Sequence, residues 1–326
     1  MKEFLKIIRW QNLVIVVLTM VLMRYAIIEP LIGKVSVLST ATGEQIPMEL
    51  QFAWYNFIIL VSATVLLTAA GYVINDYFDI KTDLINKGEV LVGTKISRRK
   101  AMMWHSVLNV VGVAAGFYVS WRANYFWFGI IFLIVSGLLY FYSASYKRQF
   151  LIGNLVVAVL TAMVPFLVVI FEWSALYRHY MVNTIEMPKL VFLFAWVGGF
   201  ALYAFLTTLA REIIKDIEDF EGDMAYGRNT VPVVIGIPAS KMAVAALAII
   251  TIVSLYLVWF FFLHDKFTFI YLSAAIVVPF LYVLYQLYRG TDKRELHSAS
   301  NFMKIVMLSG IFYSVVVKII ITWNLI

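Results

Sequence analysis

Nine apolar runs, each about as long as a lipid bilayer is thick, follow one another through this 326-residue sequence. A membrane-spanning helix needs about 20 predominantly apolar residues. The runs cover approximately residues 12–29, 52–75, 101–120, 125–143, 150–171, 189–210, 240–263, 267–288 and 302–323. The chain is 63% hydrophobic and 14% charged, whereas soluble domains average about 45–50% and about 25%. We therefore predict an all-α integral membrane protein with nine transmembrane helices, forming a single domain over residues 1–326.

The basic residues are distributed unevenly between the predicted loops. Most of the 26 Lys and Arg residues fall on the side of the membrane where nine spans place the N terminus. Because cytoplasmic loops carry an excess of Lys and Arg, this side is predicted to be the cytoplasm. The net charge of +7 then reflects membrane topology and does not indicate nucleic-acid binding. We expect a multi-pass protein of the plasma membrane of a prokaryote, with its active site facing the cytoplasm.

Two stretches rich in aspartate follow apolar runs on this cytoplasmic side. The first, INDYFDIKTD at residues 74–83, contains Asp76, Asp79 and Asp83. The second, IKDIEDFEGD at residues 214–223, contains Asp216, Asp219 and Asp223. Spacings of three, four and seven residues place side chains on one face of a helix. Each stretch is therefore predicted to present a stripe of carboxylates, and Asn75 extends the first stripe.

The two stretches also indicate an internal duplication. Each aspartate of the second lies 140 positions after its counterpart in the first. An even number of spans separates the two, so both face the same side of the membrane. This arrangement predicts two parallel four-helix pseudo-repeats, at about residues 1–145 and 146–290, followed by one extra helix at about 300–323.

Carboxylates near a membrane require compensating partners. An aspartate at mid-bilayer costs roughly 2.5–3.5 kcal/mol, and facing carboxylates repel unless cations bridge them. Clustered oxygen ligands suit Mg²⁺, which often binds carboxylates together with substrate phosphates. The chain has no cysteine and only four scattered histidines, which disfavours thiolate and zinc sites. Lysines and arginines on the same side favour a metal-bridged diphosphate; a divalent-cation transporter and a plain solvated acidic helix end are the alternatives.

Three motifs resemble those of the UbiA superfamily of intramembrane prenyltransferases. Residues 75–83, NDYFDIKTD, resemble its NDxxDxxxD signature, and residues 219–223, DFEGD, resemble its second DxxxD signature. Residues 142–148, YSASYKR, lie where the family carries a tyrosine and a Lys-Arg pair. The resemblance implies helices around a central cavity open to the cytoplasm and to lipid. It also implies two Mg²⁺ ions, a polyprenyl diphosphate donor and a lipophilic acceptor, with the protein embedded in membrane lipid.

The resemblance assigns roles to individual residues. The metal–diphosphate cluster would contain Asn75, Asp76, Asp79, Asp216, Asp219 and Asp223. Catalytic roles would fall on Asp79, Asp83, Asp219 and Asp223, with Asp83 acting either as an orienting partner or as the base that removes the acceptor proton. Substrate-binding roles would fall on Asn12, Lys87, Tyr142, Lys147, Arg148, Lys215 and Arg228.

Residues 211–223, REIIKDIEDFEGD, followed by GRNTVP, look most like the archaeal-type branch that makes ether lipids. That branch transfers geranylgeranyl to geranylgeranylglyceryl phosphate, so the attacking atom is a hydroxyl oxygen. The runner-up is a quinone-pathway enzyme that prenylates hydroxybenzoate or dihydroxynaphthoate. Two departures from the family pattern stand out. The NKPxRP segment reads NKGEVLV from Asn86 onward, and the RPxN segment has Trp10 in place of proline.

Overall fold

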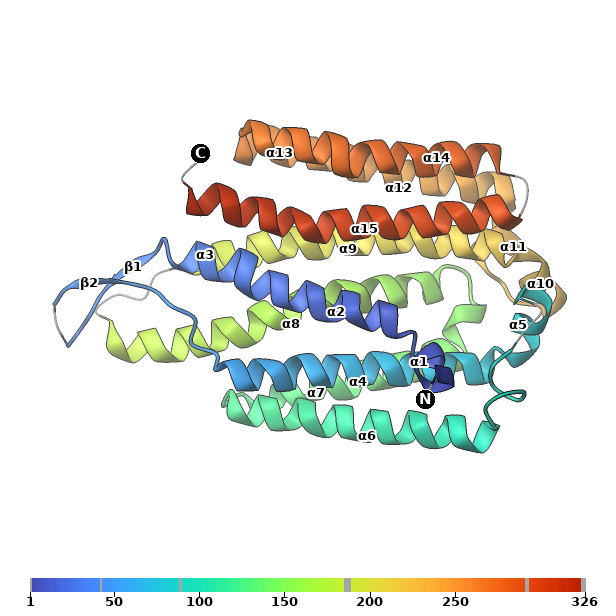
Figure 1. Cartoon of the computed structure of the whole chain (residues 1–326), viewed down its shortest axis with the longest axis horizontal. Coiled ribbons are helices and arrows are strands. Elements are labelled where there is room, and N and C mark those ends of the chain that lie inside the picture. Colours follow the sequence, from blue (N-terminus) through green and yellow to red (C-terminus); the bar gives the residue numbers. More distant parts are fainter. Residues whose placement is uncertain (1, 42, 88–89, 185–188, 291–292, 324–326) are drawn as a thin grey trace.

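The computed structural model describes residues 2–41, 43–87, 90–184, 189–290 and 293–323. Within these ranges, nine helical segments are long and apolar enough to cross a membrane, as the sequence predicts. They are Trp10–Ile32, Trp54–Phe78, Arg98–Arg122, Phe126–Ala144, Ile152–Asn183, Val191–Glu218, Ile237–Leu263, Lys266–Arg289 and Lys293–Thr322. Figure 1 shows these helices lying side by side along one direction. The prediction of an all-α membrane fold is confirmed.

The spanning helices are α2 (Trp10–Leu22) with η1 (Met23–Ile28) and α3 (Glu29–Ile32), α4 (Trp54–Phe78), α6 (Arg98–Arg122), η2 (Phe126–Phe128) with α7 (Gly129–Ala144), α8 (Ile152–Asn183), α9 (Val191–Glu218), α12 (Ile237–Val258) with η4 (Trp259–Leu263), α13 (Lys266–Tyr271) with η5 (Leu272–Val277) and α14 (Val278–Arg289), and α15 (Lys293–Thr322). Short connecting elements are α1 (Lys2–Ile7), α5 (Ile80–Lys87), η3 (Tyr146–Arg148), α10 (Phe220–Ala225) and α11 (Val231–Ile235). Strands β1 (Ser36–Leu38) and β2 (Gln45–Pro47) pair antiparallel.

The two ends of the helical bundle differ in structure. Helices α1, α5, α10 and α11 gather at the end predicted to be cytoplasmic, and the hairpin β1–β2 lies at the opposite end (Figure 1). Helix α8 extends about three turns beyond the predicted limit near residue 171, up to Asn183. The charged residue at that limit, Glu172, is buried against Arg24, so the carboxylate does not force the helix to end there.

Both aspartate stretches are divided between two helices, which corrects the picture of one continuous helical stripe. Helix α4 ends at Phe78 and α5 begins at Ile80, with Asp79 at the junction. Asp219 lies at the equivalent junction between α9 and α10. The backbone hydrogen bonds nevertheless continue four residues back, from Asp79 N to Asn75 O and from Asp83 N to Asp79 O. The chain therefore bends at each middle aspartate without losing its hydrogen bonding.

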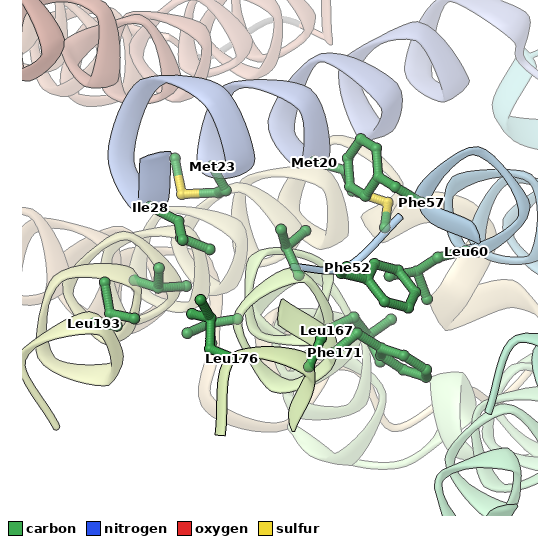
Figure 2. Close-up of a cluster of buried hydrophobic side chains, with 14 of the residues drawn as sticks. Met20, Met23, Ile28, Phe52, Phe57, Leu60, Leu167, Phe171, Leu176 and Leu193 are labelled. Carbon is green, nitrogen blue, oxygen red and sulfur yellow. The ribbon is translucent and has the colours of Figure 1, made fainter. Parts of the chain in front are cut away.

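An apolar core fills the half of the bundle opposite the aspartates. Its side chains, shown in Figure 2, come from α2, η1, α4, α8 and α9 and from the segment before α4; they include Met20, Met23, Ile28, Phe52, Phe57, Leu60, Leu167, Phe171, Leu176 and Leu193. Along α4, Leu60 precedes Asn75 by fifteen residues, which corresponds to about 22 Å of helix. This core fills the outer half, and the aspartate motifs lie at the other end of the bundle.

Candidate active site

A cavity of about 810 Å³ lies among α2, α4, α7, α8, α9, α12 and α15. Charged and other polar side chains are concentrated at its end nearest the aspartate motifs: Arg9, Asn12, Tyr72, Asn75, Tyr142, Arg211, Glu212, Lys215 and Lys304. Beyond them the lining is mainly apolar, and Met23, Phe132 and Leu167 belong both to this lining and to the core of the outer half. The cavity therefore has a charged mouth and an apolar body that could receive a long hydrocarbon chain.

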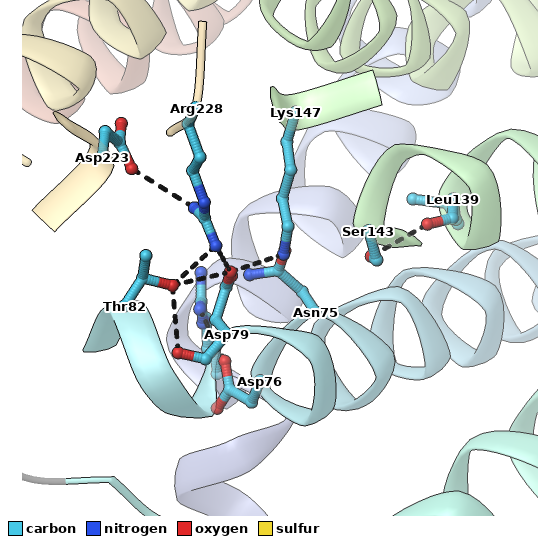
Figure 3. A network of polar contacts seen from close by, with 10 residues as sticks. Asn75, Asp76, Asp79, Thr82, Leu139, Ser143, Lys147, Asp223 and Arg228 are labelled. Carbon is cyan, nitrogen blue, oxygen red and sulfur yellow. Dashed lines mark hydrogen bonds and ion pairs between the residues drawn. The ribbon is translucent and has the colours of Figure 1, made fainter. Parts of the chain in front are cut away.

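Asp79 is the centre of a polar network beside this mouth (Figure 3). Its Oδ1 atom lies 2.7 Å from Lys147 Nζ and 2.7 Å from Arg228 Nη2. The same Arg228 nitrogen donates to Thr82 Oγ1 at 2.6 Å, and Lys147 Nζ donates to Asn75 Oδ1 at 3.0 Å. Two cations thus share one carboxylate oxygen, in a site where Asp79 is only 7% exposed.

The pKa values in this network follow from burial and charge. Burial alone would raise the pKa of Asp79, but Lys147 and Arg228 outweigh it and hold that pKa below its ordinary value. Burial lowers the pKa of Lys147 to about 8, although Asp79 opposes the shift. Burial likewise raises the pKa of Asp223 to about 6, against the opposing effect of Arg228. Burial thus moves the pKa values of both Lys147 and Asp223 from their ordinary values toward neutrality.

Arg228 joins the two aspartate motifs directly. While its Nη2 atom contacts Asp79, its Nη1 atom lies 3.3 Å from Asp223 Oδ1. A second link runs from Gly222 N to Asn86 Oδ1 at 3.1 Å and ties α10 to α5. A Cβ atom at Gly222 would lie 2.4 Å from that amide oxygen, which explains the glycine of the DFEGD motif. The structure therefore brings together two segments that are 140 residues apart in sequence.

The first aspartate of each motif is held by a residue of another helix or turn. Arg9, just before α2, donates from Nη2 to Asp76 Oδ1 at 2.9 Å. Asn154, near the start of α8, donates from Nδ2 to Asp216 Oδ2 at 2.8 Å. Each contact fixes the orientation of one carboxylate, and each supporting residue precedes or begins the first span of its half of the chain.

The donor set suits a hard divalent cation. Carboxylate and amide oxygens are the protein ligands that Mg²⁺ prefers, and the motifs supply them from Asn75, Asp76, Asp79, Asp216 and Asp223. Among the described residues, no group of three or more acidic or histidine side chains is already gathered around one point. Instead, Asp79 is neutralised by Lys147 and Arg228, and a metal would take over part of that role. The chemistry of the residues therefore fits Mg²⁺.

The structure distributes the predicted substrate-binding residues over three places. Asn12, Tyr142 and Lys215 line the cavity, and Lys147 and Arg228 lie in the Asp79 network. Arg148 lines a separate pocket. Lys87 ends α5, and its side chain lies outside the described part of the structure. Asp83 lies in the first turn of α5 and Asp219 at the junction of α9 and α10, and neither lines the cavity.

Sequence reasoning missed several residues of the site. Thr82 and Asn154 hold site residues through hydrogen bonds, while Arg211, Glu212 and Lys304 line the charged mouth. Lys304 offered a signal, because a lysine inside an apolar run is costly unless it faces a cavity. Thr82 offered none, since a threonine between charged residues has no distinctive pattern.

Comparison with known proteins finds relatives of this chain in both sequence and structure. The model of the UbiA prenyltransferase family matches residues 36–308. A digeranylgeranylglyceryl phosphate synthase from Methanosphaera stadtmanae is 33% identical over 259 residues, which cover 78% of this chain and 85% of that protein. The enzyme of the same name from Thermococcus kodakarensis is 33% identical over 264 residues, covering 80% of this chain and 84% of that protein.

Solved structures share the fold. A UbiA homolog from Aeropyrum pernix superimposes with a TM-score of 0.62 at 15% identity, over 92% of this chain and 98% of that one. A UbiA homolog from Archaeoglobus fulgidus, bound to DMAPP and Mg²⁺, superimposes with a TM-score of 0.53 at 16% identity, over 96% of this chain and 99% of that one. The family model covers most of the chain and the curated relatives match over their main length, so the resemblance carried by the three motifs is confirmed: this chain belongs to the UbiA prenyltransferase family.

Proposed function

We propose that this chain transfers geranylgeranyl from its diphosphate to geranylgeranylglyceryl phosphate in the membrane, with Mg²⁺ as cofactor. The observation that carries the proposal is the cavity, whose apolar body ends at a mouth rich in cations next to both aspartate motifs. An isoprenoid diphosphate has the same division into an apolar tail and an anionic head. The curated relatives named digeranylgeranylglyceryl phosphate synthase support this choice of donor and acceptor.

The aspartate motifs are suited to hold the metal against the donor. Oxygen atoms would come from Asn75, Asp76, Asp79, Asp216, Asp219 and Asp223. When bound, Mg²⁺ neutralises charge that develops on the departing diphosphate. Lys147 and Arg228, already directed at Asp79, would contact the phosphate oxygens. The solved relative with DMAPP and Mg²⁺ bound supports this pairing of a prenyl diphosphate with a divalent metal.

The cavity walls would protect the reacting carbon. Departure of diphosphate leaves an allylic cation that water would destroy, and the apolar lining excludes water. Tyr72 and Tyr142 line the polar end of the cavity, where their ring faces can stabilise positive charge. Asp83 does not line the cavity. Against the effect of burial, the pKa of Arg9 is raised chiefly by Asp76 and that of Arg228 chiefly by Asp79, and Asp83 adds a smaller contribution to each. We therefore assign Asp83 an orienting role, in preference to the role of base.

The phosphate of the acceptor would bind at cations of the mouth that do not belong to the Asp79 network. Arg211 and Lys215 on α9 and Lys304 on α15 line the cavity there. Glu212 engages Arg211 at 2.9 Å and Lys215 at 3.5 Å. Among the described residues that line the cavity, four are cationic (Arg9, Arg211, Lys215 and Lys304) and one is a carboxylate, Glu212. This lining suits a phosphate. A second cationic group, distinct from the Lys147–Arg228 pair, thus favours a glycerophosphate acceptor over an uncharged one.

The cellular setting follows from topology. Arg9 and Lys215, two residues of the charged mouth, lie at the start of α2 and in the last turn of α9. These helix ends adjoin the short helices α1 and α10, which Figure 1 shows gathered at one end of the bundle, and the basic loops connect spans on the same predicted side. Because such loops stay in the cytoplasm, we propose that the donor enters from the cytoplasmic side of the plasma membrane. The acceptor, with its long apolar tail, would arrive through the lipid.

A transfer assay tests the proposal. Purified protein with Mg²⁺ and radiolabelled geranylgeranyl diphosphate would be offered geranylgeranylglyceryl phosphate or hydroxybenzoate in parallel. We expect labelled lipid from the glycerophosphate only. The product should vanish in Asp79→Ala and Asp219→Ala but persist in Glu221→Ala, a matched control because Glu221 is exposed beside Asp219. Label on hydroxybenzoate instead would show that the protein acts on an aromatic acceptor, as enzymes of the quinone pathway do. No product with any donor, together with Mg²⁺ flux in proteoliposomes, would favour a cation transporter.

A further inference from the structure

A second pocket, which we call the arginine pocket, opens on the cytoplasmic side. It has a volume of about 420 Å³ and is lined by Tyr77, Phe78, Ile80, Lys81, Thr82, Arg98, Arg148, Tyr226 and Arg228. Four of these side chains are cationic, and none of the described residues that line it is acidic. Such a lining attracts a small, highly charged anion, and the tyrosine hydroxyls can add hydrogen bonds to it.

The arginine pocket and the main cavity have no lining residue in common. The Asp79 network, drawn in Figure 3, connects the two linings. Arg228, which lines the pocket, contacts Thr82 and Asp79. Lys147 links Asp79 to Asn75, which lines the main cavity. Lys147 and Arg228, which both contact Asp79 Oδ1, therefore lead from the mouth of the main cavity to the arginine pocket.

We propose that the arginine pocket binds inorganic diphosphate after it has left the prenyl chain. This inference rests on the proposed function, because it concerns the product of the same reaction. Inorganic diphosphate carries several negative charges and cannot leave through the apolar body of the cavity or through lipid. Lys81 and Arg98 are exposed on the cytoplasmic side, so an anion that moves from Arg228 to these residues reaches solvent there. The donor and the acceptor would bind in the apolar cavity, and the water-soluble diphosphate would leave through the polar pocket.

Direct binding tests the inference independently of turnover. Calorimetry would use purified protein with Mg²⁺, its donor site filled by the unreactive analogue geranylgeranyl thiodiphosphate. Inorganic diphosphate is then titrated in. We expect the unaltered protein to bind it, and Arg98→Gln or Lys81→Gln to weaken that binding about tenfold. Arg99→Gln is the matched control, because Arg99 is exposed, adjacent in sequence and not part of the pocket lining.

Three results would overturn the inference. One is a complete lack of diphosphate binding once the analogue is in place. Another is an equal effect of Arg98→Gln and Arg99→Gln, which would reduce Arg98 to general surface charge. The third is a loss of analogue affinity in Arg98→Gln as large as the loss of diphosphate affinity, which would make the pocket part of the donor site. Failure of the transfer assay leaves these binding results unchanged, so the two proposals can fail separately.

Discussion

Asp79 and Asp219 adopt nearly the same backbone conformation, with φ −92° and ψ 2° at Asp79 and φ −94° and ψ 8° at Asp219. An α-helical residue has ψ near −42°, so each aspartate turns its chain out of a long helix and into a short one. The two motifs thus agree in backbone geometry as well as in spacing. This agreement supports our proposal that residues of about 1–145 and 146–290 are two pseudo-repeats, with α15 as the extra helix.

Replacement of Arg228 by lysine should break the direct link between the two aspartate motifs. The guanidinium reaches Asp79 with one nitrogen and Asp223 with another, whereas a single ammonium group cannot match this forked geometry. We expect Arg228→Lys to lower kcat/KM for the prenyl diphosphate about tenfold or more. The measurement is the initial rate of transfer over a range of donor concentrations.

Arg289→Lys provides the control for this substitution. Arg289 is an exposed arginine at the C-terminal end of α14, where it donates to the Tyr285 hydroxyl. The Arg289→Lys substitution likewise keeps the positive charge, at a position outside both motifs. Unchanged kinetics in Arg228→Lys would show that positive charge alone suffices at this position and that the link between the motifs is not required.

The pH dependence of transfer should report Lys147. Burial places the pKa of Lys147 at about 8, against the opposing effect of Asp79. Lys147 is therefore protonated below pH 8 and loses its charge as the pH rises through 8. We expect kcat/KM for the donor, which reports the free enzyme, to fall above this pH. In Lys147→Arg the guanidinium stays protonated, so the decline should move beyond the measured range. A decline that stays at pH 8 in Lys147→Arg would assign it to another group.

Much of the fold was predictable because the bilayer imposes a length on each span. The nine apolar runs match the nine spanning segments of the described residues to within a few residues at most ends. The largest exception is α8, predicted to end near residue 171, which continues to Asn183. Helix α9 also ends eight residues later than predicted, at Glu218, and α15 begins nine residues earlier, at Lys293. In α8, the buried partner of Glu172 is Arg24 from η1, so the pairing that permits the longer helix depends on tertiary contacts that periodicity does not reveal.

The site could be predicted where its residues recur at a regular spacing in the sequence. The repeated aspartates identified both motifs, yet the bends at Asp79 and Asp219 depend on single backbone angles that spacing does not encode. The cationic partners were harder to assign, because many lysines and arginines share the side predicted to be cytoplasmic. Lys147 and Arg228 are distinguished from the rest only by their contact with one oxygen of Asp79.

Lys304 should contribute to binding of the acceptor and not of the donor. Its ammonium group lies on α15 at the charged mouth, away from the Asp79 network, and donates to Asn301 Oδ1. Loss of one charged contact to a phosphate costs about tenfold in affinity. We therefore expect Lys304→Gln to raise KM for geranylgeranylglyceryl phosphate about tenfold while KM for the donor stays unchanged. The two constants would be measured separately, each at saturating co-substrate.

Lys318→Gln is the matched control on the same helix. Lys318 contacts Glu29 and the carbonyl of Tyr25 near the outer end and does not line the cavity. Its replacement should leave both KM values unchanged. A rise in the KM of the donor in Lys304→Gln would place Lys304 at the donor diphosphate and would remove the argument for a separate acceptor site.

The buried pair of Arg24 and Glu172 should matter for stability and not for chemistry. Nη2 of Arg24 lies 3.4 Å from Oε2 of Glu172, and both residues are at most 2% exposed. The other oxygen of Glu172 accepts the backbone N–H groups of Gln51 and Phe52, so the pair fastens the segment before α4 to α8. Removing one partner of a buried ion pair leaves an uncompensated charge and costs about 3–5 kcal/mol. Glu172→Gln should therefore lower the thermal unfolding midpoint in detergent by at least ~5 °C.

A second substitution separates the charge from the hydrogen bonds. Glutamine can still accept the two backbone N–H groups, so adding Arg24→Met to Glu172→Gln removes the unpaired cation together with its hydrogen bond to the carbonyl of Phe52. We expect the gain from removing the charge to exceed that loss, so the double variant should regain part of the lost midpoint. Glu29→Gln is the control, because Glu29 pairs with Lys318 in a half-exposed contact whose loss costs about 0–1 kcal/mol. If the double variant were less stable than Glu172→Gln alone, the contacts of Arg24 with the Phe52 carbonyl and with the rings of Tyr25 and Phe57, and not its pairing with Glu172, would be its main contribution.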